Sequence, residues 1–562
     1  MKKGDIYEGI VKKSLFPSKG VVRVDDSRDV IVKNCVPGQR VRFCISKKRN
    51  TKIEGRVTEI LEKAPYELKE PSCPHFGRCG GCSYQNIPYA EQLRLKETQV
   101  RELLSPVVED FDDIFEGIIP SPKETKYRNK MELTFGDERK GGPLSLGMHG
   151  AGSFYDIIDV DCCRIMSDDF NLIRSATRGY FDLLQIPYYH RLRHDGYLRH
   201  LVLRRGEFTG ENFVCLVTAD ESKLPKEALR EEDLLKGWVE TLKLLCLDDP
   251  IKGIIHVRNN SLADAVIDEG TTALYGEGEF SERLLGLDFT ITPFSFFQTN
   301  SAGAEVLYGK VREYAAAGTR HENGRMKPVI YDLYSGTGTI TQLMAPVADK
   351  AIGVEIVEEA VESARRTASR NGLSNCDFIC GDVLKALDDI GEKPDFIILD
   401  PPRDGIHPKA LAKITAYGVE NMVYVSCKPT SLARDLASLT QAGYQVRRLC
   451  CVDMFPATGG IETVVLLSQQ NPDDRIRVKV DLDELDETSA EAKATYKKIT
   501  EWVQEKYGFH VTNLNIAQVK QKHGIIEREN YNKPKSVDSR QPGCPEEKVK
   551  AIEDAMRYFQ MI

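Results

Sequence analysis

A cysteine ends an apolar run in the C-terminal half of the chain, in the sequence Val425-Ser426-Cys427-Lys428-Pro429. A glutamate, Glu462, stands just before a later apolar run. A thiolate can add to an electrophilic ring carbon, and a carboxylate nearby can remove the proton that must leave afterwards. The two residues therefore suggest covalent catalysis, with Cys427 as nucleophile and Glu462 as base. A buried, inert cysteine is the ordinary alternative.

A glycine-containing turn, Asp332-Leu333-Tyr334-Ser335-Gly336-Thr337-Gly338, lies between an apolar strand-like run and an apolar helical stretch. Such glycines let the backbone approach a ligand at the carboxyl end of a sheet. Glu355 ends the next run, where an acid can accept ribose hydroxyls, and Gly381-Asp382 ends the third. Because the three-glycine spacing of a dinucleotide site is missing, the pattern favours S-adenosylmethionine. A plain structural turn remains the alternative.

The fourth apolar run ends in Asp400-Pro401-Pro402-Arg403. A carboxylate there can accept a hydrogen bond from the imide of a uracil ring, and the prolines fix the loop beside it. With Cys427 and the cofactor turn, this predicts methyl transfer to C5 of a pyrimidine after the thiolate adds to C6. Cytosine is the competing base, although its site would more naturally offer a glutamic acid to N3.

Three further cysteines, Cys73, Cys79 and Cys82, lie on one glycine-rich loop. Three thiolates so spaced can surround a soft metal centre, and a fourth ligand is expected from Asp161-Cys162-Cys163-Arg164. The spacing alone leaves an iron-sulfur cluster and tetrahedral zinc both open. A disulfide framework is not expected, because the chain carries no secretory signal and the cytoplasm keeps thiols reduced.

Three regions must position these residues, and a C-terminal extension follows them. Residues 1–63 alternate like strands separated by turns, which predicts a small antiparallel β-barrel, and they hold about twice as many basic as acidic residues. Such a barrel is a common RNA-binding platform, although it can also be idle. Residues 64–284 predict a mixed α/β central domain that holds the cysteine loop and a helix near 88–115, which we expect to pack on the following domain. Residues 285–468 alternate strands and helices, so we expect an α/β domain with a doubly wound parallel sheet.

Two basic strand-like stretches, Tyr127-Arg128-Asn129-Lys130-Met131-Glu132 and Leu198-Arg199-His200-Leu201-Val202-Leu203-Arg204, lie in the central region. Their arginines are expected either along an RNA backbone or on a solvated sheet face.

Residues 469–562 predict a helical extension, with a capping box at Thr488-Ser489-Ala490-Glu491, a helix at Asn513–Lys522 and another beginning at Pro545. It would serve either RNA contact or packing. The formal net charge of −8 argues against indiscriminate coating of nucleic acid. No run of about 18 apolar residues is present, so we expect a cytoplasmic protein without membrane contact.

The combined motifs resemble the RNA uracil-5-methyltransferase family, most closely its 23S rRNA members. The matching stretches are the N-terminal barrel, the three-cysteine loop, the Asp332 turn, Phe296-Phe297-Gln298-Thr299-Asn300, Asp400-Pro401-Pro402-Arg403, Ser426-Cys427-Lys428-Pro429 and Phe455 through Glu462. The resemblance covers residues 1 to about 468. One departure is Gly460, where family sequences often carry a histidine two residues before the catalytic glutamate.

The resemblance implies a set of roles beyond those read from the residues. It implies that the barrel is a TRAM domain and that the methyltransferase domain is Rossmann-like. It implies a [4Fe-4S] cluster on Cys73, Cys79, Cys82 and Cys163, although the adjacent Cys162 could substitute. The S-adenosylmethionine contacts would be Gln298, Tyr334, Glu355 and Asp382, with Asp400 beside the base, Cys427 as nucleophile and Glu462 as base.

The resemblance also implies that the substrate is a uridine in 23S rRNA. Transfer-RNA uridine, RNA cytosine and a non-catalytic iron-sulfur RNA-binding scaffold are the alternatives. No DNA partner is expected, and a monomer is the default.

Overall fold

The computed structural model describes residues 1–25, 28–49, 52–153, 155–263, 265–317, 327–383, 386, 393–469, 496–507, 509, 511–523 and 545–558. The chain divides into two compact units, Met1–Asp474 and Arg475–Ile562. Among the helices of the described residues, none is both long and apolar enough to cross a membrane.

The N-terminal residues form a closed five-stranded barrel in the order β1-β2-β3-β5-β4, which confirms the predicted barrel. Alternating residues such as Val22, Val32, Val41 and Phe43 fill its interior. All of its strand pairs are antiparallel except β3 with β5. The strands are β1 (Ile6–Leu15), β2 (Lys19–Asp25), β3 (Arg28–Lys33), β4 (Arg40–Arg49) and β5 (Lys52–Glu62).

The central region contains a seven-stranded sheet in the order β13-β12-β11-β10-β7-β8-β9. Apolar residues of its strands pack with helices α3 (Asp168–Leu183) and α4 (Glu231–Lys243) in one core. The strands are β7 (Lys130–Gly136), β8 (Ser145–His149), β9 (Ile157–Asp159), β10 (Leu198–Gly206), β11 (Glu211–Thr218), β12 (Ile251–Arg258) and β13 (Thr271–Gly276). A hairpin of β14 (Phe280–Leu284) and β15 (Leu287–Ile291) follows.

Two arginines of this sheet contradict their predicted role on an exposed face. Arg199 and Arg204 are buried. Arg199 donates to the carbonyls of Asn259, Ser261 and Ala263, and Arg204 donates to those of Thr292, Pro293 and Ser295. A guanidinium has five N–H donors, so one buried arginine can satisfy several loop carbonyls at once. These residues therefore brace loops and are not free to follow an RNA backbone.

The last part of the first unit holds an eight-stranded sheet in the order β18-β17-β16-β19-β20-β22-β21-β6. All six predicted strands are present, but the sixth, β22, is antiparallel to β20. The reason is a seventh strand, β21, which joins β22 through a short connection and so pairs with it antiparallel. The strands are β6 (Phe115–Ile119), β16 (Val329–Leu333), β17 (Lys350–Glu355), β18 (Cys376–Cys380), β19 (Phe396–Leu399), β20 (Asn421–Ser426), β21 (Tyr444–Val452) and β22 (Glu462–Gln469).

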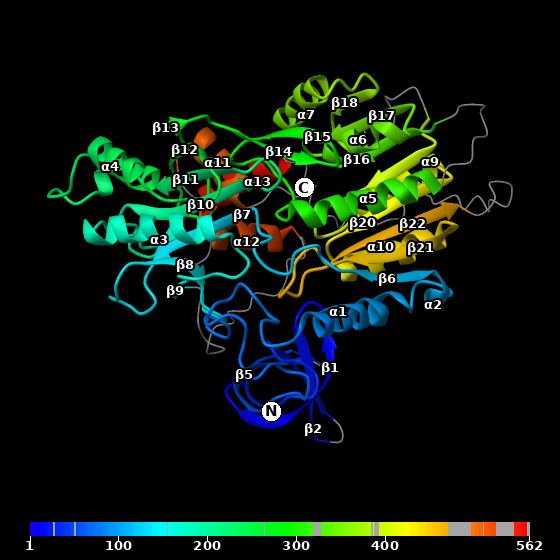
Figure 1. The fold of residues 1–562 in the computed structure, drawn as a ribbon, viewed down its shortest axis with the longest axis horizontal. Helices are drawn as coiled ribbons and strands as arrows, with labels where there is room; N and C mark the ends of the chain where they lie inside the picture. Colours follow the sequence, from blue (N-terminus) through cyan, green and yellow to red (C-terminus); the bar gives the residue numbers. More distant parts are fainter. Residues whose placement is uncertain are drawn as a thin grey trace. The chain divides into compact units, whose positions relative to one another are not determined.

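Alternate residues of each strand enter separate cores on the two faces of this sheet. On one face, Ile330, Ile398 and Val423 pack with helix α5 (Ser301–Ala317). On the other, Tyr331, Ile397 and Met422 pack with α9 (Pro408–Tyr417), α10 (Pro429–Gln441) and α1 (Tyr89–Leu104). Figure 1 shows α5 crossing the sheet, with α1 beside the strand β6. Among the described residues of this unit, the remaining α-helices are α2 (Phe111–Ile114), α6 (Thr339–Met344) and α7 (Glu358–Arg370).

The segment after the cysteine loop packs on the eight-stranded sheet and adds a strand to it. Helix α1 packs against α10, and β6 pairs in parallel with β21 as the edge strand. Val100 and Leu104 of α1 and Phe111 of α2 are buried in the sheet's second core. Helix α1 thus packs on the eight-stranded sheet, where a helix near 88–115 was expected, and β6 adds an edge strand that was not predicted.

The described residues of the second unit form three helices, α11 (Tyr496–Tyr507), α12 (Asn513–Lys522) and α13 (Glu546–Tyr558). Ile499, Val503, Ile516 and Ile552 share one core. The predicted capping box at 488–491 lies outside the described residues.

Candidate active site

Four parallel strands bring most of the predicted site residues to one edge of the eight-stranded sheet. Strands β16, β17, β19 and β20 run in the same direction. The carboxyl ends of parallel strands share an edge, where ligands bind in open α/β folds. Tyr334, Glu355, Asp400 and Cys427 stand at or directly after these ends.

The glycine-containing turn after β16 is shaped by a backbone that bends tightly. Tyr334 has a φ of 72°, which is uncommon for a residue with a side chain, and Gly338 has a φ of 73°. A Cβ on Gly338 would collide with the ring of Phe378. The Glu355 carboxylate accepts a hydrogen bond from the Gly336 N–H at 3.0 Å. The predicted ribose-binding acid is thus fixed to the predicted cofactor turn.

Two buried polar atoms in this turn have no hydrogen-bond partner among the residues that the structure describes: Asp332 Oδ1 and Ser335 Oγ. The other Asp332 oxygen accepts from Thr341 Oγ1 at 2.6 Å. Burial raises the pKa of Asp332 to about 7. A ligand with a cationic amine and several hydroxyls, such as S-adenosylmethionine, would satisfy these atoms and offset the cost of burying the carboxylate.

The other two predicted cofactor contacts are Asp382 and Gln298, which lie on different segments of the chain. Asp382 follows β18 at the sheet's edge. Burial, followed by the charge of Asp382, raises the pKa of Tyr334 to about 12. Gln298 precedes α5, and its backbone carbonyl accepts a hydrogen bond from Asn129 Nδ2 at 2.9 Å.

Tyr308 of α5, which was not singled out in the sequence, lies beside the predicted cofactor contact Gln298. Its side chain is buried and hydrogen-bonded to Gln298. Burial, followed by the charge of Asp400, raises the pKa of Tyr308 well above its usual range. Only an inward position on a helix could have signalled it, and core tyrosines share that signal.

Cys427 and Glu462 stand at the same end of two adjacent strands. Ser426 of β20 pairs with Thr463 of β22 in an antiparallel register. Cys427 follows Ser426 and Glu462 precedes Thr463, so both lie on the same side of that pair. The Glu462 charge also acts on Cys427: it is the second cause, after burial, that raises the pKa of Cys427 to about 11. The sheet therefore brings together the predicted nucleophile and base.

Two neighbouring groups set the electrostatics of this pair. Burial raises the pKa of Asp400 to about 7 and raises that of Glu462 well above its usual range, with Asp400 adding to the shift in Glu462. The Arg403 charge opposes the shift in both Cys427 and Glu462. Helix α10 also begins two residues after Cys427, and a helix N-terminus favours a thiolate.

The cysteine loop forms a separate candidate metal centre. Cys73, Cys79, Cys82 and Cys163 line one cavity together with apolar residues that include Met131, Met148 and Ile165. Burial raises the pKa of Cys82 to about 12 and that of Cys163 to about 11, and the other thiols add to both shifts. Four thiols facing one apolar cavity fit a soft metal centre, because its positive charge would stabilise the thiolates.

The neighbouring Cys162 has different surroundings. It is exposed, and its sulfur lies 3.3 Å from Asp161 Oδ1 and 3.7 Å from His75 Nε2. Cys163 shares the cavity of the other three thiols, so it is the better placed of the two adjacent cysteines.

The chain is similar to known RNA methyltransferases. A family model described as tRNA (Uracil-5-)-methyltransferase matches residues 289–470. A Clostridium tetani protein described as an uncharacterized RNA methyltransferase is 44% identical over 473 residues, which are 84% of this chain and 99% of that protein. A Chlorobaculum tepidum protein with the same description is 34% identical over 482 residues, 82% of this chain and 96% of that protein.

A solved structure extends the similarity to the fold. It is that of the Pyrococcus abyssi tRNA (uracil-54, C5)-methyltransferase in complex with S-adenosyl-L-homocysteine, with 25% sequence identity and a TM-score of 0.62. The similarity covers 82% of this chain and 100% of that one.

Proposed function

This chain belongs to the RNA uracil-5-methyltransferase family, and we propose that it methylates C5 of a uridine in 23S ribosomal RNA through a covalent adduct of Cys427. The observation that carries this proposal is the placement of Cys427 and Glu462 at one end of adjacent strands, beside Asp400 and the cofactor turn. S-Adenosylmethionine, the cofactor of this enzyme class, supplies the methyl group.

The reaction begins with the ring carbon. Because C6 is inaccessible within a base stack, the uridine must leave the stack to reach the sheet's edge. Asp400 accepts a hydrogen bond from N3–H and so orients the ring. The Cys427 thiolate forms a bond to C6, which moves electron density to C5 and O4. Arg403 and the start of α10 favour the thiolate that this step requires.

Methyl transfer forms the bond from the methyl carbon to C5 while the bond from that carbon to the sulfonium sulfur breaks. Glu462 then removes the C5 proton, the C5–C6 double bond forms again, and the Cys427 thiolate leaves C6. Gln298, Tyr334, Glu355 and Asp382 would hold the cofactor.

The cysteine loop is proposed to hold a [4Fe-4S] cluster on Cys73, Cys79, Cys82 and Cys163. The shared apolar cavity supports the ligand set, and zinc remains the alternative occupant. When bound, the metal centre would tie the loop at residues 73–82 to the central sheet through Cys163. The barrel at residues 1–63 is proposed to be a TRAM-like domain that binds RNA.

Transfer RNA is the second candidate substrate. The solved relative from Pyrococcus abyssi acts, by its description, on uracil-54 of tRNA. The similarity covers the full length of that protein and 82% of this chain. The experiment that separates the candidates incubates the protein and S-adenosylmethionine with 23S rRNA and with tRNA from cells that lack the gene. Digestion to nucleosides and mass analysis should yield 5-methyluridine from 23S rRNA; its appearance only in tRNA would overturn the substrate assignment, and 5-methylcytidine would overturn the base.

A further inference from the structure

The connection between β21 and β22, residues 453–461, is held mainly from outside the catalytic sheet. The Ala457 carbonyl accepts hydrogen bonds from the backbone N–H groups of Ser83 and Tyr84 at 2.8 and 2.9 Å. The Pro456 carbonyl accepts from the Tyr127 hydroxyl at 2.9 Å. Ala457 itself has a φ of 64°, an uncommon value that these contacts fix. Because Glu462 directly follows this connection, its position depends on them.

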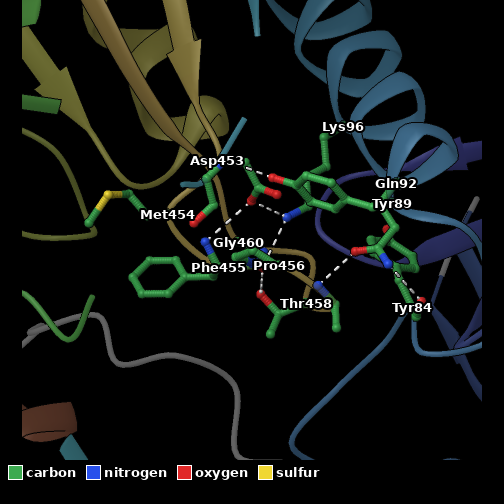
Figure 2. A network of polar contacts seen from close by, with 12 residues as sticks. Tyr84, Tyr89, Gln92, Lys96, Asp453, Met454, Phe455, Pro456, Thr458 and Gly460 are labelled. Atoms are coloured by element: carbon green, nitrogen blue, oxygen red, sulfur yellow. Dashed lines mark hydrogen bonds and ion pairs between the residues drawn. The ribbon is translucent and has the colours of Figure 1, made fainter. Parts of the chain in front are cut away.

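Helix α1 supplies the most deeply buried of these contacts. Lys96 Nζ lies 2.6 Å from Asp453 Oδ1 and donates to the Phe455 carbonyl at 3.0 Å. Both members of the ion pair are fully buried, with side-chain exposures of 0%. Figure 2 shows Lys96 pointing from α1 to the start of the connection.

Gln92 lies one helical turn before Lys96, so the two side chains share a face of α1. Its Oε1 accepts from the Ala457 N–H at 2.7 Å, and its Nε2 donates to the Tyr84 and Ile87 carbonyls, each at 3.1 Å. Figure 2 shows the Gln92 amide pointing from α1 to this connection. One face of α1 therefore makes hydrogen bonds to both ends of the segment from Asp453 to Ala457.

Packing alone does not require the buried ion pair between Lys96 and Asp453. Two apolar side chains of similar volume would fill the same space without the cost of removing two charges from water. A charged pair does what apolar residues cannot, because it fixes the direction of the Asp453 carboxylate and of the Phe455 carbonyl. The chain also lacks a side chain at Gly460, so support for Glu462 from its own loop is reduced.

We propose that Lys96 and Gln92 are positioning residues that hold the 453–461 connection so that the Glu462 carboxylate reaches the C5 proton of the covalent adduct. This inference rests on the proposed function and deepens it. Lys96 and Gln92 themselves do not touch the substrate. Their loss should impair the elimination step, in which Glu462 takes the C5 proton and the Cys427 thiolate leaves C6, more than the addition step.

The test separates the two steps in the full-length protein. Addition is followed as the denaturation-resistant adduct with RNA that contains 5-fluorouridine, which cannot lose fluorine to a base. Elimination is followed with ordinary RNA, where a methylated adduct accumulates if Glu462 cannot act. The variants are Lys96→Met combined with Asp453→Asn, which removes both charges together, and Gln92→Met, which introduces no unpaired charge. Arg94→Met, an exposed change on the same helix, is the control.

We expect elimination to slow by about 100-fold, as for a small misplacement of a catalytic group, with the methylated adduct accumulating on ordinary RNA. The rate of adduct formation with 5-fluorouridine RNA should stay within about threefold of the parent, and the control should behave as the parent. If addition and turnover fall together, or if turnover is unchanged, the inference is overturned. If the parent protein forms no adduct at all, the proposed function fails first, and the inference falls with it.

Discussion

Cys427 and Glu462 lie at the same end of two adjacent antiparallel strands, each one residue beyond the Ser426–Thr463 pair. The first strand, β20, belongs to the parallel part of the sheet. The second, β22, belongs to the antiparallel hairpin of β21 and β22 that lies next to β20. The antiparallel hairpin is therefore what carries the proposed base to the edge where the proposed nucleophile and the cofactor turn already lie.

Replacing the base should trap the enzyme on its substrate. We expect Glu462→Gln to lower turnover by about 10²- to 10⁴-fold, the usual contribution of a general base. Addition of Cys427 and methyl transfer should still proceed, so a denaturation-resistant complex that contains methylated uridine should accumulate. Gel electrophoresis and mass analysis would detect it. Normal turnover by this variant would assign the base elsewhere.

The rate of adduct formation should depend on pH. Burial raises the pKa of Cys427 to about 11, so the thiolate is the minor form at neutral pH and grows about tenfold for each pH unit. Arg403→Met removes a charge that opposes this shift and should slow addition by about tenfold at neutral pH, equivalent to about one pKa unit. Single-turnover adduct formation with 5-fluorouridine RNA, from pH 6.5 to 8.5, measures both effects.

The matched control is Arg366→Met, because Arg366 is exposed on α7 and pairs with Glu362. It should leave the rate and its pH profile unchanged. A pH-independent rate in the parent protein would mean that Cys427 is already ionised when RNA is bound.

The partly buried Asp400 should make the folded protein less stable as the pH rises. Burial raises its folded-state pKa to about 7 from the ordinary value of 3.8, so the folded state binds its proton more tightly. The stability that this proton provides is present below pH 3.8 and is lost as the pH rises through about 7. Asp400→Asn should therefore stabilise the cofactor-free protein by about 2 to 4 kcal/mol at pH 8 and by less at pH 5.

Calorimetric unfolding of the parent and the variant at the two pH values tests this expectation. The exposed substitution Glu362→Gln on α7 should show no such pH dependence. An equal effect of Asp400→Asn at pH 5 and pH 8 would show that the carboxyl is not buried in its neutral form.

The two adjacent cysteines should differ in their effect on the metal centre. Cys163→Ser should lower the iron content and the visible absorbance of anaerobically purified protein, because Cys163 shares the cavity of the other three thiols. Cys162→Ser should retain both, because its thiol is exposed and contacts Asp161. Elemental analysis also separates iron from zinc. The reverse behaviour of the two variants would assign the fourth ligand to Cys162.

Local patterns in the sequence were sufficient to predict the barrel and six strands of the catalytic sheet. These elements have alternating or continuous apolar runs bounded by turns, as in Val329–Asp332 and Phe396–Leu399. Strand β21 was missed because its first half carries Gln445, Arg447 and Arg448, and β6 because it is a short edge strand. The direction of β22 depends on the missed β21.

Contacts between distant residues were beyond prediction from one sequence. Lys96 and Asp453 are 357 residues apart, and a lysine on a charged helix gives no sign that it is buried. The same holds for Arg199 and Arg204, whose carbonyl partners lie on loops far along the chain. The site residues at strand ends could be predicted because topology alone brings those ends together; the residues that brace them could not.

Covalent attachment of RNA is the most direct measure of the central claim. The parent protein, S-adenosylmethionine and RNA that carries 5-fluorouridine at the target should form a complex that survives denaturation, with mass analysis locating the bond at Cys427. Cys427→Ala should abolish it, whereas Cys450→Ala, a change at a buried cysteine of β21, should not. A complex that persists undiminished in Cys427→Ala would contradict the account.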